Sequence, residues 1–152
     1  MKRFSALISD LDQTTKTLRK IVALEQYFRE APAEDRMWCL ALFSGRRPKR
    51  VLSTTHLREW AAEVSGLPLW LLEDSYAVVG DLAETIGLVL PPAKQNVDKS
   101  LSEWISALRE IAIADSEEKR ALIFEVWDGL SGQDRFVLNK LITGGFRVGV
   151  SQ

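Results

Sequence analysis

The residues of this sequence that could carry catalysis are few and isolated. His56 is the only histidine and Cys39 the only cysteine among 152 residues, so neither has a partner at the spacing of a metal site or a nucleophile and its base. His56 is better interpreted as a polar residue in the first turn of a helix, and Cys39 as a small buried side chain. The pairs Glu34–Asp35 and Glu117–Glu118 fall where helices are expected to begin, a position that favours acids. We therefore predict no catalytic residue and no metal ligands.

Two short motifs come close to nucleotide chemistry without completing it. Gly144–Gly145 is not followed by the Gly-Lys-Ser/Thr of a phosphate-binding loop. Trp127–Gly129 matches the end of the Lys-x-Asp-Gly signature of nucleotidyl transferases, but Val126 stands where the nucleophilic lysine would be. We interpret Trp127–Gly129 as a helix end, and we expect no cofactor in this chain and no independent enzyme.

The basic run Arg46-Arg47-Pro48-Lys49-Arg50 is the first candidate for binding. It places four cations within five residues on an expected loop, a spacing that suits contact with a phosphate backbone rather than with base edges. Short basic runs are also common in ordinary solvated loops, so this alternative stays open.

The second candidate runs from Lys140 to Ser151. A helix that ends in Thr143-Gly144-Gly145 exposes backbone N–H groups without side chains, and such a surface can approach a phosphate or a shallow groove closely. Arg147 could lie in or beside a minor groove. An ordinary helix end followed by a strand is the alternative.

The last residues are unusually apolar for a chain terminus. Phe146, Val148 and Val150 alternate with Arg147 and Gly149, a period of two that predicts an extended segment with one buried side. Because termini are usually polar, we expect residues 1–152 to be a single domain cut from a longer protein.

Composition and charge agree with one globular domain. The chain has 46% apolar and 27% charged residues and a formal net charge of −1, so a nucleic-acid partner is not suggested by the total. The charges are segregated, however: from Arg46 to Arg58 there is no acid, and from Glu59 to Leu90 there is no base. A single cysteine, no signal peptide and no long apolar run predict a cytoplasmic protein without a membrane partner.

The elements that must position these residues are all predicted to be helices. Apolar periodicity and cap residues predict an all-α array of about nine short helices that ends in an extended segment. The second helix is expected to follow caps among Asp12–Thr15, and its helical stripe is predicted to consist of Leu18, Ile21, Val22, Glu25 and Phe28. Pro32 should start the third helix and Gly45 should stop it. The later helices are expected to start at Ser53, Pro68, Asp81, the Ser100–Glu103 capping box, Asp115 or Ser116, and Ser131. Gly66, Gly129 and Gly144 are expected to end helices. Residues 91–99 are expected to form the longest loop.

Three segments together resemble the N-terminal DNA-binding domain of bacterial ATP-dependent DNA ligases. The segment Leu141–Ser151, LITGGFRVGVS, is similar to the one that closes this domain; Leu42–Arg50, LFSGRRPKR, is similar to its basic loop; and Gly80–Thr85, GDLAET, is similar to the following helix start. They occur in the family's order and spacing and extend the resemblance over nearly the whole chain.

The resemblance implies an all-helical domain that grips double-stranded nicked DNA through the minor groove on both sides of the break, in DNA repair, replication or recombination. The lysine adenylated by ATP lies in the next domain of this family, so the chain is expected to bind DNA without sealing it, with ATP and Mg²⁺ required only by the full-length ligase. Its other partners would be the catalytic domains of the same polypeptide, and we expect a monomer. The residues expected to contact DNA are Arg46, Arg47, Lys49, Arg50, Lys140, Thr143, Gly144, Gly145, Arg147 and Gly149.

A helical protein-interaction module is the alternative function. The sequence has five tryptophans, and although most are expected in the core, some could be interface anchors. The acidic stretch from Glu59 to Glu84 would then be the binding face, and the partner would be a protein rather than DNA.

Overall fold

The computed structural model describes residues 1–44, 51–130 and 132–143. Within these ranges the chain forms nine α-helices and no strand, which confirms the all-α prediction. The helices are α1 (Lys2–Asp12), α2 (Thr17–Glu30), α3 (Ala33–Phe43), α4 (Thr54–Ser65), α5 (Leu69–Val79), α6 (Leu82–Val89), α7 (Leu101–Ile113), α8 (Ser116–Gly129) and α9 (Gly132–Thr143).

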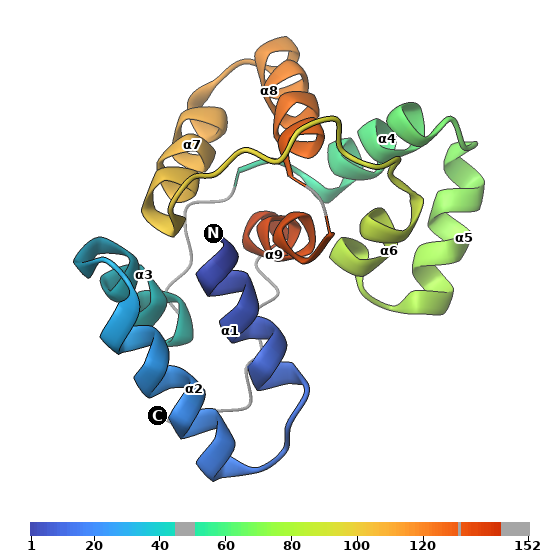
Figure 1. The fold of residues 1–152 in the computed structure, drawn as a ribbon. Helices are drawn as coiled ribbons and strands as arrows, with labels where there is room; N and C mark the ends of the chain where they lie inside the picture. Colours follow the sequence, from blue (N-terminus) through green and yellow to red (C-terminus); the bar gives the residue numbers. More distant parts are fainter. Residues whose placement is uncertain (45–50, 131, 144–152) are drawn as a thin grey trace.

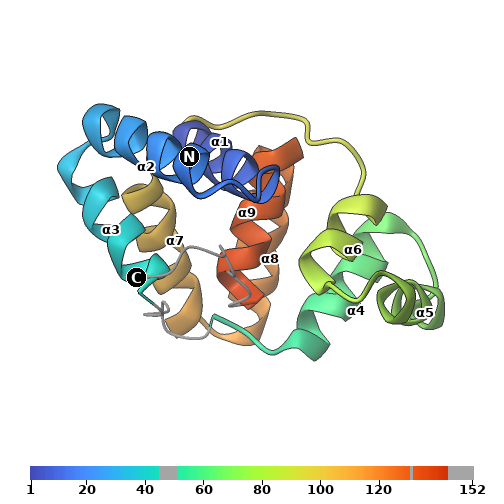
Figure 2. The same cartoon turned by 90° about the horizontal axis from the view of Figure 1, so that it is seen from below.

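Helix α9 occupies the centre of the molecule (Figure 1). Figure 2 shows α1, α2, α3 and α7 to one side of it and α4, α5 and α6 to the other. It packs against α1 on one side and α6 on the other, and Val137, Leu138 and Leu141 are among its buried residues. The two groups of helices are therefore joined through α9.

Four of the helix starts follow from local cap chemistry, as predicted. The side chains of Ser53, Asp81, Ser100 and Asp115 each accept a hydrogen bond from the backbone N–H three residues later. Ser100 forms a full capping box, because the Glu103 carboxylate accepts from the Ser100 N–H in return (3.1 Å). These bonds satisfy amides that the first helical turn leaves without partners.

Helix α2 differs from its prediction in both its start and its buried face. It begins at Thr17, one residue after Lys16, and none of Asp12–Thr15 caps it. Leu18, Ile21 and Val22 are 78%, 43% and 60% exposed, so this part of the predicted stripe does not face the core. Phe28, at its other end, is partly buried against the core. The helix is instead rotated toward Tyr27, which is buried against α1 and packs edge-on against Phe4 (6.1 Å between ring centroids). Aromatic contact with α1 therefore decides which side of α2 is covered.

Three predicted elements lie outside the described residues. These are the Gly45 stop of the third helix, the Ser131 start of the last helix, and the extended segment Phe146–Val150 that follows the Gly144 stop. None of the described helices combines the length and apolarity needed to cross a membrane.

The tryptophans are mostly in the core, with one exception. Trp60, Trp104 and Trp127 are at most 8% exposed, and Trp38 is partly buried against the core. Trp70 on α5 is 63% exposed. Burial of the others follows from helical periodicity, whereas the exposure of Trp70 needs a separate explanation.

Two buried polar side chains connect segments that are distant in the sequence. Asp35 on α3 accepts hydrogen bonds from the N–H groups of Leu101 (3.3 Å) and Ser102 (3.0 Å), so α3 caps the start of α7. Arg135 on α9 donates to the carbonyl oxygens of Leu130 (2.8 Å), Pro91 (2.8 Å) and Trp127 (2.5 Å). The guanidinium thereby gives hydrogen bonds to carbonyl groups at the end of α8, and it holds the 91–99 loop beside α9.

We expect Arg135→Met to lower the free energy of unfolding by about 3 kcal/mol, because it removes the donors of three carbonyls while keeping most of the side-chain volume. The matched control is Arg3→Ala, because Arg3 is half exposed and its ion pair with Glu30 is long, at 4.0 Å. This substitution should lower the free energy of unfolding by less than about 0.5 kcal/mol. Urea denaturation followed by circular dichroism measures both. Equal losses in the two variants would contradict a structural role for Arg135.

Candidate nucleic-acid interface

The basic residues Arg46, Arg47, Lys49 and Arg50 lie outside the described residues, but the fold fixes both ends of their segment. On the N-terminal side, the Ser44 N–H donates to the Leu40 carbonyl at the end of α3 (3.0 Å). On the C-terminal side, Val51 and Leu52 are 1% and 6% exposed. The Val51 carbonyl also accepts a hydrogen bond from the Lys119 ammonium (3.0 Å). Residues 45–50 therefore connect two anchored points.

Lys119 is the positioning residue that sequence reasoning missed. It lies on α8, 68 positions from Val51, and no local pattern links a lysine to a backbone carbonyl so far away.

Arg58 on α4 was also not among the predicted contacts. Its guanidinium donates to Thr55 (3.4 Å), and its Nε atom is buried without a hydrogen-bond partner in the described part of the chain.

Of the second predicted group, the structure describes Lys140 and Thr143, while Gly144, Gly145, Arg147 and Gly149 lie outside the described residues. The Thr143 hydroxyl donates to the Lys140 carbonyl (3.4 Å) in the last turn of α9. The Lys140 ammonium forms an ion pair with Asp81, and the two side chains are 17% and 29% exposed. A DNA phosphate at Lys140 would therefore have to share the ammonium with Asp81.

Asp81 caps α6 and pairs with Lys140 at the same time. Burial alone would raise the pKa of its carboxyl group, but the hydrogen bonds from Lys140 and from the Glu84 N–H outweigh burial and lower the pKa below its ordinary value. The charged form is thus favoured, and it links the start of α6 to the end of α9.

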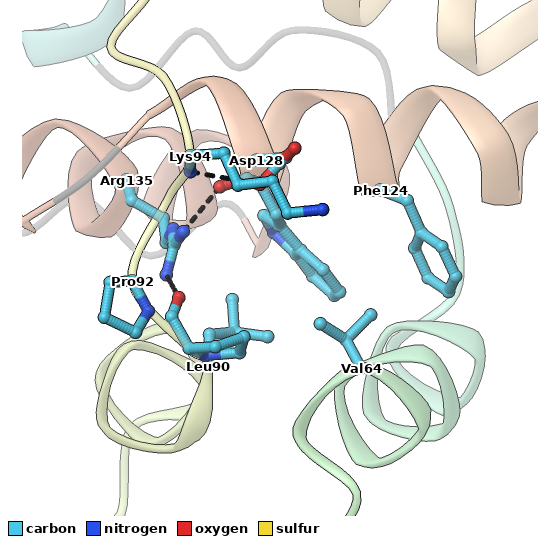
Figure 3. A pocket seen from close by; sticks show the side chains of 9 residues that line it. Val64, Leu90, Pro92, Lys94, Phe124, Asp128 and Arg135 are labelled. Atoms are coloured by element: carbon cyan, nitrogen blue, oxygen red, sulfur yellow. Dashed lines mark hydrogen bonds between the residues drawn. The ribbon is translucent and has the colours of Figure 1, made fainter.

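An apolar hollow lined in part by α8 is a poor candidate for catalysis (Figure 3). Its volume is about 310 Å³, and its walls include Val64, Leu90, Phe124 and Trp127. The polar side chains at its edge already form structural hydrogen bonds. Asp128 accepts a hydrogen bond from the Lys94 N–H (3.1 Å), and Arg135 donates hydrogen bonds to three backbone carbonyls. The described ranges also contain no group of three or more metal-ligating side chains.

The remaining catalytic candidates have the structural roles that the sequence predicted. Cys39 is 0% exposed, and burial raises the pKa of its thiol to about 12, so it is uncharged at neutral pH. His56 lies in the first turn of α4, where its ring stacks on Trp60 with 5.4 Å between centroids. Asp128 and Gly129 form the end of α8, as expected for Trp127–Gly129.

Comparison with known protein families decides the identity of the domain. The model of the family described as DNA ligase N terminus matches residues 1–152. The chain belongs to this family. The resemblance to the N-terminal domain of ATP-dependent DNA ligases is thereby confirmed, and so is the fold class. A comparison with curated proteins finds no match.

In this ligase N-terminal domain, the Asp81–Lys140 pair should couple the two ends that it joins. We expect Asp81→Asn and Lys140→Met to show a coupling energy of about 1 kcal/mol or less in a double-mutant cycle, because both side chains keep some contact with water. Asparagine remains a good helix cap, so the variant removes the charge and keeps the cap.

The contribution of this pair should also depend on pH. Because folding lowers the pKa of Asp81, its stabilisation is fully present above the unfolded pKa of about 3.9 and is lost as the pH falls through the folded value. Urea denaturation at several pH values should show the difference in stability between the wild type and Asp81→Asn shrinking as the pH falls below about 3.9. A difference that stays constant as the pH falls below that value would contradict the ion pair.

Proposed function

We propose that this ligase N-terminal domain binds nicked duplex DNA without sequence preference, through the phosphate backbone and the minor groove. The observation that carries the proposal is the basic run Arg46–Arg50 between two anchored ends, in a chain of the DNA ligase N-terminal family. Four cations on a segment with fixed ends can follow a phosphate backbone at a lower entropic cost than the same charges on a free tail.

The end of α9 supplies the second proposed contact. Thr143, Gly144 and Gly145 offer hydrogen-bond donors with little side-chain bulk, which suits close approach to phosphates. Arg147 and Gly149 would continue this contact along the minor groove, where an arginine side chain reads width rather than sequence. Lys140 would contribute to DNA binding only if a phosphate and the Asp81 carboxylate both contacted its ammonium group.

For the whole protein we propose an ATP-dependent DNA ligase that uses ATP and Mg²⁺ and acts in DNA repair, replication or recombination in the cytoplasm. Residues 1–152 would be its single helical DNA-binding domain and would act as a monomer. The adenylated lysine would lie in the catalytic domains of the same polypeptide. By holding the nick, this domain would raise the effective concentration of those catalytic domains at the break.

We expect the variant with Arg46, Arg47, Lys49 and Arg50 all changed to Glu to lose binding to nicked duplex in a low-salt gel shift. Four reversed charges replace attraction to phosphates with repulsion, and non-specific affinity rests on that attraction. The variant should keep the helical circular dichroism of the wild type, because none of its changes lies in the described helices.

The matched control reverses four exposed cations on α1 and α2 and in the turn between them: Lys2, Lys16, Arg19 and Arg29. It changes the net charge by the same amount, so it should weaken binding far less than the loop variant if contact is local. Equal loss in both variants, or unchanged affinity in the loop variant, would overturn the proposed contact surface.

A further inference from the structure

Helix α5 presents an outward face that the proposed DNA contacts do not use. Trp70 and Val78 on this face are 63% and 87% exposed, and Glu73 and Asp74 between them are exposed as well. With Ala77, these residues follow the spacing i, i+3, i+4, i+7 and i+8, so they share one side of the helix. The opposite side holds Leu72, which is fully buried.

The position of α5 leaves this face open. The helix packs on α4 and α6 at the edge of the molecule away from α1, α2 and α3 (Figures 1 and 2). A large apolar side chain that stays in water gains none of the stabilisation that burial would give. Tryptophan is also the residue type that most often anchors protein interfaces. An exposed Trp70 on the same side of the helix as the exposed Val78 therefore favours an interface with another molecule.

The charge around α5 indicates what kind of molecule that is. From Glu59 to Leu90 the chain has six acids and no base. Two of the acids are engaged, because Glu63 pairs with Arg120 and Asp81 pairs with Lys140. No ion pair is found for Glu73 or Asp74 within the described ranges. Duplex DNA would be repelled from this face, whereas lysine and arginine side chains would be attracted to it.

We propose that the outward face of α5 is a docking surface for a basic amphipathic helix of a protein partner. Apolar side chains of that helix would cover Trp70 and Val78, and its lysine or arginine side chains would pair with Glu73 and Asp74. This is the usual division of labour in helix recognition, in which apolar anchors give affinity and flanking charges give orientation. The domain would then bind DNA and protein through different surfaces.

The test uses a fluorescein-labelled amphipathic peptide of leucine and lysine as the probe, and its counterpart with glutamate in place of lysine. Fluorescence anisotropy at low salt should show binding of the lysine peptide only. Trp70→Ala, and separately the pair Asp74→Lys with Val78→Ser, should each weaken binding at least about 10-fold, the loss expected for an interface anchor.

The matched control carries the same chemistry on α7, where Glu110 and Ile113 are both exposed. The pair Glu110→Lys with Ile113→Ser should leave peptide affinity within about twofold, as expected for surface changes outside an interface. No binding of the lysine peptide, equal binding of both peptides, or equal loss in the α5 and α7 variants would overturn the proposal. Trp70→Ala should leave affinity for nicked duplex unchanged, and a loss there would assign α5 to the DNA contact instead.

Discussion

The buried guanidinium of Arg135 is the interaction on which the arrangement of the helices depends. From α9 it donates hydrogen bonds to carbonyl oxygens at the end of α8, at Leu130 and in the 91–99 loop. One turn further along α9, Asn139 accepts from the Trp127 indole (2.9 Å), and Lys140 pairs with Asp81 at the start of α6. These polar contacts fix the rotation of a central helix whose apolar residues alone would pack in several ways.

A fixed framework matters because the proposed contacts lie where helices end. The basic run Arg46–Arg50 lies between the end of α3 at Phe43 and Val51, and the Lys119 side chain on α8 holds Val51 in place. Acidic residues are concentrated from Glu59 to Glu84, on the part of the chain that forms α4, α5 and α6. A nearly neutral domain can thus combine cations suited to phosphates with a separate acidic and apolar helix face suited to protein. Net charge alone would have hidden both properties.

Local chemistry made four helix starts predictable, while contacts between distant segments escaped prediction. A serine or aspartate cap acts over three residues, so Ser53, Asp81, Ser100 and Asp115 could be identified from the sequence. The buried side of α2 could not, because Tyr27 packing on α1 outweighs the apolar stripe at Leu18 and Val22. Arg135, Asp35 and Lys119 bond to backbone groups, and backbone groups leave no residue-specific signal in a sequence. Of the predicted DNA contacts, Lys140 and Thr143 are described structurally, and all ten remain predictions.

The most direct test of the central claim is the salt dependence of binding to nicked duplex. Fluorescence anisotropy with a labelled nicked duplex, at salt concentrations between about 50 and 200 mM, gives the slope of log affinity against log salt. Each phosphate neutralised contributes about −0.9, so a backbone grip through several cations predicts a slope of about −3 or steeper, equal for two unrelated DNA sequences. A slope near zero, or affinity that follows the sequence rather than the salt, would contradict a backbone grip.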